Sequence, residues 1–285
     1  MKVLWISDFN INNNPGGSQR TDDEIIKEGR KRGHEITCFN LNDRDELIQA
    51  NTFDLLVSNN LEHLRLRRPE VFQFICQFPN HVRLEHDSCS YLSVEDRKLL
   101  YGSAKQSFFL SDYHHRMFVE RFGPIFHNVS IITPPINTKK FKVTKSPEER
   151  QDKTLYIGFM HFLKGTQNFF SHVLHNPDKQ FVVAAWGDPN MENAVRRFPN
   201  VEFLGTVSYD YMPVLYNKYK TLYYHPIGFE AFCRAVGEAV LCGIDLEVGD
   251  NIGAVHDYNS YGLQEFRKRC DESKNKFWDL VEIKA

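Results

Sequence analysis

Short apolar runs alternate with amphipathic stretches along the first half of the chain. Runs at 2–7, 35–39 and 55–58 have the length and composition of buried strands, and residues 20–32 and 44–49 have helical spacing. Gly33 follows the first of these helices and suits a C-terminal cap. We predict further strands near 72–77, 82–85, 106–110 and 130–133. The alternation is typical of a parallel sheet covered by helices, so the first half is predicted to be a Rossmann-like domain.

The same pattern begins again after a polar, charged segment at 139–153 that follows Pro134-Pro135. Strands are predicted at 154–158, 180–185, 201–204 and 221–225, with a helix at 166–175 and a charged final helix at 264–280. We therefore expect an α/β protein with two Rossmann-like domains facing a cleft. The expected domains are 1–140, joined by the C-terminal helix 264–285, and 151–263.

Composition narrows the class of protein without deciding its function. A chain of 285 residues with 41% hydrophobic content can form two medium cores, and a net charge of −2 gives no global attraction to nucleic acid or membrane. Its six cysteines show no C-x-x-C spacing, so we expect reduced thiols and no zinc site. With no signal-peptide pattern and no run of membrane-spanning length, we expect a soluble, cytoplasmic protein.

Two glutamates, Glu230 and Glu238, stand eight positions apart between His225 and Gly243. The first half of this segment is rich in Gly and Pro, so Glu230 is expected on a loop or first helical turn and Glu238 about two turns later. A helix N-terminus attracts anions, and carboxylates beside it suit sugar hydroxyls next to a phosphate. Acidic residues are also ordinary near helix N-termini, so the spacing alone leaves both explanations open.

This segment resembles the signature of retaining glycosyltransferases of the GT-B fold, of the family 4 type. The family pattern Pro-x3-Glu-x-Phe-x5-Glu-Ala-x3-Gly is matched in order by Pro226, Glu230, Phe232, Glu238, Ala239 and Gly243. The resemblance extends over most of the chain, including the segment 131–137 and Phe141. It implies a metal-independent enzyme whose last helix crosses back to the first domain.

Other motifs lie where this family has donor-binding groups. Gly16-Gly17 precedes a helix, His86-Asp87 follows a strand, and Lys164-Gly165 precedes a helix, where a lysine can neutralise a diphosphate. By the resemblance, the catalytic residues are His86, Glu230 and Lys164. The implied donor-binding residues are Gly16, Gly17, Lys164, Gly165, Gly187, Gly205, Glu230, Ala231, Phe232 and Glu238, with the backbone at 251–253 near the phosphates. Tyr209 and Tyr211 are expected to pack rather than bind.

One position departs from the family pattern. The family motif Gly-Arg-x4-Lys-Gly has Phe159 in place of its arginine, and Arg234 or Arg196 could supply the missing charge. Asp43-Arg44-Asp45 resembles a metal-binding D-x-D, but it is more simply the start of a helix, so we expect no catalytic metal.

The acceptor is less defined than the donor. Basic clusters at 65–68, 139–142 and 267–269 are most simply solvated faces, yet an anionic acceptor such as DNA or a lipid head group would use them. Candidate acceptor-binding residues are Ser18, Arg20, Asp87 and Arg65. The sequence thus indicates transfer of a sugar from a nucleotide sugar to an acceptor hydroxyl, a modified DNA base being one candidate. A GT-B-like nucleotide-sugar epimerase and a non-catalytic binding module are the alternatives.

Overall fold

The chain forms two compact units, each with its own parallel sheet. The computed structural model describes residues 1–44, 48, 52–87, 92–124 and 128–283. Unit 1 comprises Met1–Pro135 and the C-terminal segment from Lys268, and unit 2 comprises Ile136–Arg267. The predicted linker at 139–153 belongs to unit 2, where the short helix η1 (Pro147–Glu149) leads into a strand.

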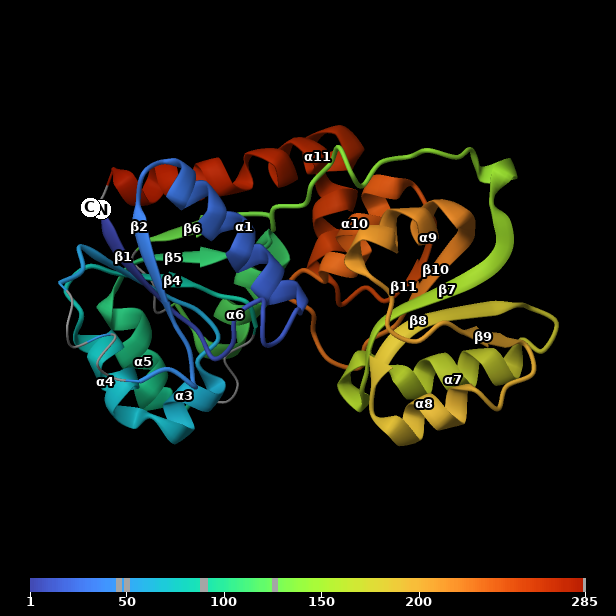
Figure 1. Cartoon of the computed structure of the whole chain (residues 1–285), viewed down its shortest axis with the longest axis horizontal. Helices are drawn as coiled ribbons and strands as arrows, with labels where there is room; N and C mark the ends of the chain where they lie inside the picture. Colours follow the sequence, from blue (N-terminus) through green and yellow to red (C-terminus); the bar gives the residue numbers. More distant parts are fainter. Residues whose placement is uncertain (45–47, 49–51, 88–91, 125–127, 284–285) are drawn as a thin grey trace. The chain divides into compact units, whose positions relative to one another are not determined.

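Unit 1 is built on six parallel strands in the order β2-β1-β3-β4-β5-β6 (Figure 1). The strands are β1 (Lys2–Ile6), β2 (Glu35–Phe39), β3 (Leu55–Ser58), β4 (His81–Leu84), β5 (Ala104–Phe109) and β6 (Val129–Ile131). On one face lie α3 (Glu62–Arg67), α4 (Pro69–Gln77), α5 (Val94–Ser103) and α6 (Asp112–Phe122), and on the other lie α1 (Gly17–Lys31) and part of α11 (Gly253–Glu282). Both faces of the sheet are therefore covered, as the apolar runs predict.

The prediction of a strand at 72–77 is wrong, because this segment is the second half of α4. Pro69 occupies the first turn of this helix, where its missing N–H costs nothing. Val71, Phe72 and Ile75 are buried, a spacing that places them on one helical face rather than alternating across a strand. The helix expected at 44–49 falls mostly outside the described residues.

Unit 2 has five parallel strands in the order β11-β10-β7-β8-β9. They are β7 (Gln151–Met160), β8 (Phe181–Gly187), β9 (Val201–Phe203), β10 (Tyr219–Tyr224) and β11 (Asp245–Val248). Helices α7 (Thr166–His175) and α8 (Pro189–Val195) cover one face, and α9 (Met212–Lys218) and α10 (Arg234–Cys242) cover the other. Short η2 (Phe162–Lys164) and η3 (Tyr209–Tyr211) complete the unit.

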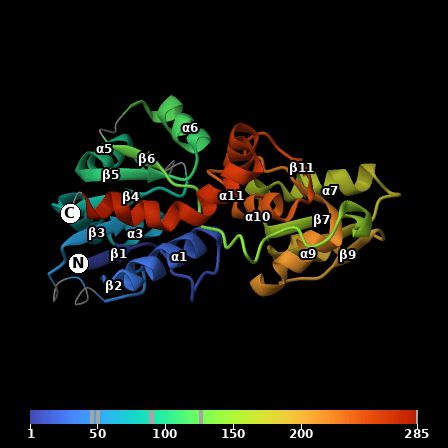
Figure 2. The same cartoon turned by 90° about the horizontal axis from the view of Figure 1, so that it is seen from above.

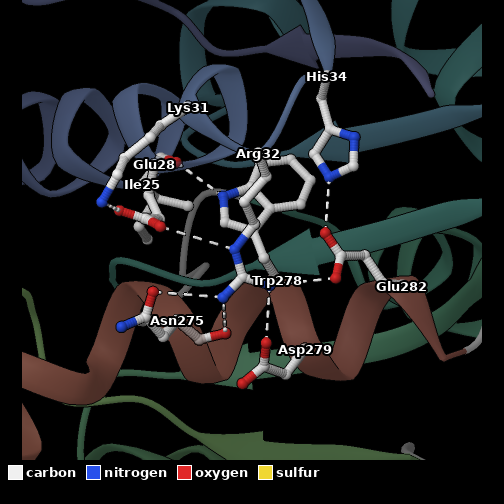
Figure 3. Close-up of polar contacts among 9 residues, drawn as sticks. All are labelled: Ile25, Glu28, Lys31, Arg32, His34, Asn275, Trp278, Asp279 and Glu282. Carbon is white, nitrogen blue, oxygen red and sulfur yellow. Dashed lines mark hydrogen bonds and ion pairs between the residues drawn. The ribbon is translucent and has the colours of Figure 1, made fainter.

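The C-terminal part of α11 lies alongside α1 in unit 1 (Figure 2). Trp278 is fully buried, and its indole N–H donates to the carbonyl oxygen of Ile25 at 2.8 Å. A Cβ at Gly29 would lie 2.2 Å from the Trp278 ring, so only glycine permits this approach. Arg32 binds Asp279, Glu282 and Asn275 at the rim of the contact (Figure 3). The predicted return of the last helix to the first domain is confirmed.

α11 bends at Gly262, whose φ of 71° is outside the helical region. None of the helices in the described part of the chain combines the length and the apolar character that crossing a membrane requires. The described cysteines, Cys38, Cys76, Cys233, Cys242 and Cys270, are free thiols, and Cys89 lies outside the described residues.

Candidate active site

A lysine and a glutamate meet at the carboxyl edge of the unit 2 sheet. Lys164 ends η2 after β7, and Glu230 follows the neighbouring strand β10. Between them the chain approaches closely, since a Cβ at Gly165 (φ 75°) would lie 1.9 Å from the carbonyl oxygen of His225. The amide of Ile227 also donates to Leu163 O at 3.2 Å. Glycine after the lysine therefore holds the two loops together and sets the Lys164–Glu230 contact.

The pair has short, charge-assisted geometry. Lys164 Nζ lies 2.6 Å from Glu230 Oε1, and the Tyr224 hydroxyl donates to the same oxygen at 2.8 Å. Burial lowers the pKa of Lys164, but the nearby Glu230 carboxylate outweighs it and raises that pKa above its ordinary value. The Lys164 side chain is 41% exposed, so the pair is not sealed from solvent.

The loop that carries Glu230 is fixed by its own backbone. The Glu230 amide donates to Asn251 O at 2.9 Å, and the Gly253 amide donates to Glu230 O at 3.0 Å. Asn251 Nδ2 in turn donates to the carbonyls of Pro226 and Gly228. The Gly253 amide, which the sequence places near the donor phosphates, is therefore already hydrogen-bonded to the Glu230 carbonyl oxygen.

Cys233 marks the turn from this loop into α10. Among the described residues it is the only non-glycine residue with a positive φ, 64°. Such a conformation is costly for a residue with a Cβ, so the surrounding contacts must enforce it. Burial, and next the charge of Glu230, raises the pKa of the Cys233 thiol to about 12, so the thiol is neutral. Because α10 begins only at Arg234, Glu238 lies one turn into the helix rather than two.

Glu238 is buried, at 3% exposure, among donors from its own unit. Its Oε1 accepts from the Tyr209 hydroxyl at 2.7 Å and from Arg234 Nε at 3.1 Å. The Tyr216 hydroxyl shares its proton between Ala235 O at 3.0 Å and Glu238 Oε2 at 3.4 Å. Tyr209, expected only to pack, therefore also forms a hydrogen bond to the second glutamate. Arg234 Nη2 also donates to the Tyr209 hydroxyl at 3.2 Å, so the three side chains form one network.

Aromatic side chains occupy the edge where the family pattern has an arginine. Phe159 is 44% exposed, is paired in register with Trp186 of β8, and stacks on His161 with ring centroids 5.8 Å apart. Of the two candidate replacements for the missing charge, Arg196 lies over the Phe203 ring and Arg234 is bonded to Glu238.

The remaining donor-binding candidates in unit 2 shape the backbone and the core. Gly187 and Gly205 both have positive φ, and a Cβ at Gly187 would lie 2.4 Å from the carbonyl oxygen of Met160. Ala231 and Phe232 are buried, and Phe232 stacks on Phe266.

In unit 1, His86 is held by a carboxylate from α1. His86 Nε2 lies 2.8 Å from Asp22 Oδ1, and Asn59 Nδ2 donates to Asp22 Oδ2 at 2.7 Å. Both the His86 and the Asp22 side chains are nearly covered, at 3% and 7% exposure. This places a histidine and an aspartate in the dyad arrangement that fixes an imidazole ring.

A buried ion pair lies directly before His86 in the chain. The Arg83 and Glu85 side chains are both fully buried, with Arg83 Nη2 2.9 Å from Glu85 Oε2. Tyr101 also donates to Oε2, and Arg83 Nη1 donates to Asn59 O at 2.6 Å. Glu85 Oε1 accepts from the amides of His86 and Asp87, so the backbone at the candidate site is fixed as well.

The other unit 1 candidates lie at the start of α1 or on α3. Gly16 is the N-cap residue of α1 and Gly17 its first residue, and the Ser18 hydroxyl donates to Gln19. Arg20 is half-buried in the first turn of α1. Arg65 donates from Nε to Asp96 at 2.7 Å, so this part of the basic cluster is an ion pair rather than an unpaired phosphate ligand.

Asp43, of the D-x-D motif, accepts from the Asn40 amide, and Asp45 lies outside the described residues. Across the described ranges, no group of three His, Cys, Asp and Glu side chains is arranged to hold a metal.

Three contacts of this site were not predicted from the sequence: Asp22 to His86, Tyr224 to Glu230, and Tyr209 to Glu238. Each joins residues from separate elements, so no local motif marks it. The signal that could have found Asp22 is a charged residue on the inner face of α1, next to the buried Ile25 and Ile26.

Comparisons with known proteins identify the fold. No protein-family model and no curated protein sequence matches the chain. Sucrose-phosphate synthase from Thermosynechococcus elongatus superposes with a TM-score of 0.70 at 14% identity, covering 100% of this chain and 97% of that chain. HepE from Anabaena, solved with UDP and glucose, gives a TM-score of 0.69 at 16% identity, with 96% and 94% covered.

An alpha-glucosyltransferase solved with UDP and a 13-mer DNA containing an HMU base gives a TM-score of 0.60 at 15% identity, with 99% and 95% covered. The predicted architecture of two Rossmann-like α/β units, the GT-B fold, is confirmed.

Proposed function

We propose that this GT-B chain is a retaining glycosyltransferase that moves a sugar from a nucleotide-sugar donor to an acceptor hydroxyl. The observation that carries the proposal is the 2.6 Å contact between Lys164 and Glu230 at the carboxyl edge of the unit 2 sheet. A cation and a carboxylate side by side match the two halves of a nucleotide sugar, its diphosphate and its hydroxyl groups. Solved structures of the same fold that contain UDP or UDP-glucose add support.

In this proposal the cation and the carboxylate change partners when donor binds. Lys164 moves from Glu230 to the diphosphate, the group that gains charge as the sugar leaves, and Glu230 turns to the sugar hydroxyls. Tyr224 continues to donate to Glu230, which keeps the carboxylate aligned. The leaving phosphate itself takes the acceptor proton, so the reaction needs no separate base in either unit.

Glu238 is proposed to receive the ribose of the nucleotide. Its oxygens already accept from Tyr209, Tyr216 and Arg234, so a ribose hydroxyl either takes a remaining acceptor position or displaces one of these donors. The weakest of them by distance is Tyr216, at 3.4 Å.

The acceptor is proposed to carry a hydroxyl on an anionic scaffold, with a hydroxymethylated DNA base as the first candidate. Support comes from the shared fold with the alpha-glucosyltransferase solved with HMU-containing DNA. Since Arg65 is paired with Asp96, phosphate contacts would come from other basic residues than this one.

The test begins with binding of UDP-, GDP- and ADP-sugars by calorimetry, followed by transfer to hydroxymethylated DNA, lipid and sugar acceptors. Glu230→Gln should lower transfer by about 10²- to 10³-fold while circular dichroism stays unchanged. Glu202→Gln is the matched control, because Glu202 also pairs with a lysine of unit 2, Lys153, at 3.0 Å. It should transfer sugar at the wild-type rate.

Three results would count against the proposal. Absence of binding to every donor would reject a donor site altogether. Formation of an epimer from donor alone would favour an epimerase. A product of inverted anomeric configuration, read by NMR, would reject retention and leave glycosyl transfer in place.

A further inference from the structure

We infer that Asp22 is a positioning residue for His86, one that fixes the ring proton on Nε2 and leaves Nδ1 as a hydrogen-bond acceptor for a substrate hydroxyl. The inference rests on the proposed function for what His86 binds. It assigns a role to a residue on α1 that lies outside every sequence motif of the site.

The contact between the two side chains determines where the proton lies. Nε2 of His86 is 2.8 Å from Oδ1 of Asp22. A carboxylate only accepts hydrogen bonds, and a neutral imidazole has one donor and one acceptor nitrogen. The nitrogen facing Asp22 must therefore carry a proton, and in the neutral ring the lone pair is then on Nδ1.

The carboxylate is itself fixed. Its other oxygen, Oδ2, accepts from Asn59 Nδ2 at 2.7 Å, and Asn59 is fully buried at the end of β3. With one oxygen on each partner, Asp22 cannot rotate without losing a hydrogen bond. A buried carboxylate such as Asp22 is costly unless hydrogen-bond donors compensate for its lost hydration, and His86 and Asn59 are those donors.

The backbone of His86 is held by a second, separate carboxylate. Glu85 Oε1 accepts from the amides of His86 at 3.0 Å and of Asp87 at 3.1 Å, and Arg83 fixes Glu85 from within the sheet. Asp22 therefore adds what the backbone contacts do not supply, which is the orientation and tautomer of the ring. A contact made only for stability would not need to select a tautomer.

The decisive variant is Asp22→Asn, which keeps the shape and can present an N–H to the ring. The matched control is Asp23→Asn, the next residue on α1, whose carboxylate pairs with Lys27 at 2.6 Å. Both substitutions remove one negative charge from the same turn. Two measurements are made on each protein: the 15N NMR shifts of the His86 ring, and kcat and KM for donor.

We expect wild type and Asp23→Asn to show the Nε2–H tautomer, and Asp22→Asn to gain the Nδ1–H form. We expect Asp22→Asn to lower kcat about tenfold, because a substrate hydroxyl loses the Nδ1 acceptor, with KM for donor within about twofold. Should Asp22→Asn fail to fold, Asn59→Ala leaves the carboxylate in place but frees one oxygen, and should lower kcat about fivefold.

The two arms separate this inference from the proposed function. If wild type transfers sugar while Asp22→Asn shows the wild-type tautomer and kcat, the positioning role is overturned and the enzyme remains. If the tautomer changes in Asp22→Asn but wild type transfers no sugar, Asp22 does position the ring and the proposed function is what fails. Equal losses in Asp22→Asn and Asp23→Asn would also overturn the inference, because they reduce the effect to charge.

Discussion

The two units present charged groups at the same edge of similar sheets, but they hold them in opposite ways. In unit 1, His86 and Asp22 are nearly covered, and the ion pair before them, Arg83 and Glu85, is fully buried. In unit 2, Lys164 is 41% exposed and its partner Glu230 is 14% exposed. A buried network cannot exchange partners without a large cost, whereas an open pair can. We therefore expect substitutions at the unit 1 site to lower the free energy of unfolding, and substitutions at the unit 2 site to change it little.

The strongest test of this difference is Glu85→Ala in unit 1. It leaves the Arg83 guanidinium fully buried without its carboxylate and removes the acceptor of Tyr101 and of two backbone amides. Breaking a buried pair by deleting one partner costs about 3–5 kcal/mol of unfolding free energy. Urea denaturation followed by hydrogen exchange in each unit measures it. Glu230→Ala, the counterpart in unit 2, should cost less than about 1 kcal/mol, and similar losses in both would remove the distinction.

Acid should also unfold unit 1 before unit 2. Burial, and next the charge of Arg83, lowers the pKa of His81 to about 3, and burial lowers the pKa of His114 to about 4. The unfolded chain takes up these protons near pH 6.5 and the folded chain does not, so stability is lost as pH falls from about 6.5 towards 4. Between pH 6.5 and pH 5, each histidine lowers the free energy of unfolding by about 2 kcal/mol, at about 1.36 kcal/mol per pH unit.

Hydrogen exchange at pH 7 and pH 5 shows which of the two units unfolds first as the pH falls. Burial lowers the pKa of His172 in unit 2 as well, and the charge of Glu247 opposes this shift. Amides of β4 and β5 should lose protection at pH 5 while those of β7 and β8 keep it. Earlier exchange in β7 and β8 would contradict the assignment of acid sensitivity to unit 1.

In unit 2 the expected loss is of activity rather than of stability. Lys164→Met keeps the length of the side chain and removes the cation, so transfer should fall about 10²- to 10³-fold through lost stabilisation of the leaving diphosphate. The free energy of unfolding should change by less than about 1 kcal/mol, because the pair is partly solvated. Lys153→Met, which breaks the Lys153–Glu202 pair of the same unit, is the control. A stability loss without an activity loss would make Lys164 structural.

The sequence predicts the parts of this molecule that depend on local pattern. The strands at 35–39 and 55–58 and the helix at 166–175 occur at the predicted residues, since apolar runs and helical spacing are properties of neighbouring residues. The segment 72–77 was misread because a short apolar run does not distinguish a strand from a buried helix, and Pro69 was the cue to the helix. Lys164 and Glu230 stand beside glycine and proline in their own loops, and the resemblance to the family motif selects them as candidates.

What could not be predicted is the set of contacts that only the folded sheet creates. Asp22 on α1 meets His86, which follows β4 and lies 64 residues later in the chain. The burial of Glu238 likewise depends on Tyr209, which arrives from η3. Such contacts join positions far apart in sequence, and one sequence carries no sign of which distant residues pair.

The smallest expected effect concerns the orientation of the Glu230 carboxylate by the Tyr224 hydroxyl. The Tyr224 hydroxyl donates to Glu230 Oε1 at 2.8 Å, and burial raises the Tyr224 pKa, so the hydroxyl is a permanent donor. Tyr224→Phe removes one hydrogen bond from a hydroxyl to the Glu230 carboxylate, while Lys164 still holds the same oxygen. A hydrogen bond to a charged group is worth about 1.5 kcal/mol at the lower end of its range, so kcat/KM for donor should fall about tenfold.

Tyr223→Phe is the matched control, because the adjacent tyrosine donates instead to the backbone oxygen of Asn168 at 3.2 Å. It should leave kcat/KM within about twofold. A loss of kcat/KM of about 10²-fold in Tyr224→Phe would mean that Glu230 is held as rigidly as His86. The contrast between the two units would then be wrong. Equal small losses in both variants would assign the effect to packing under β10, and the Glu230 carboxylate would be oriented by Lys164 and by donor alone.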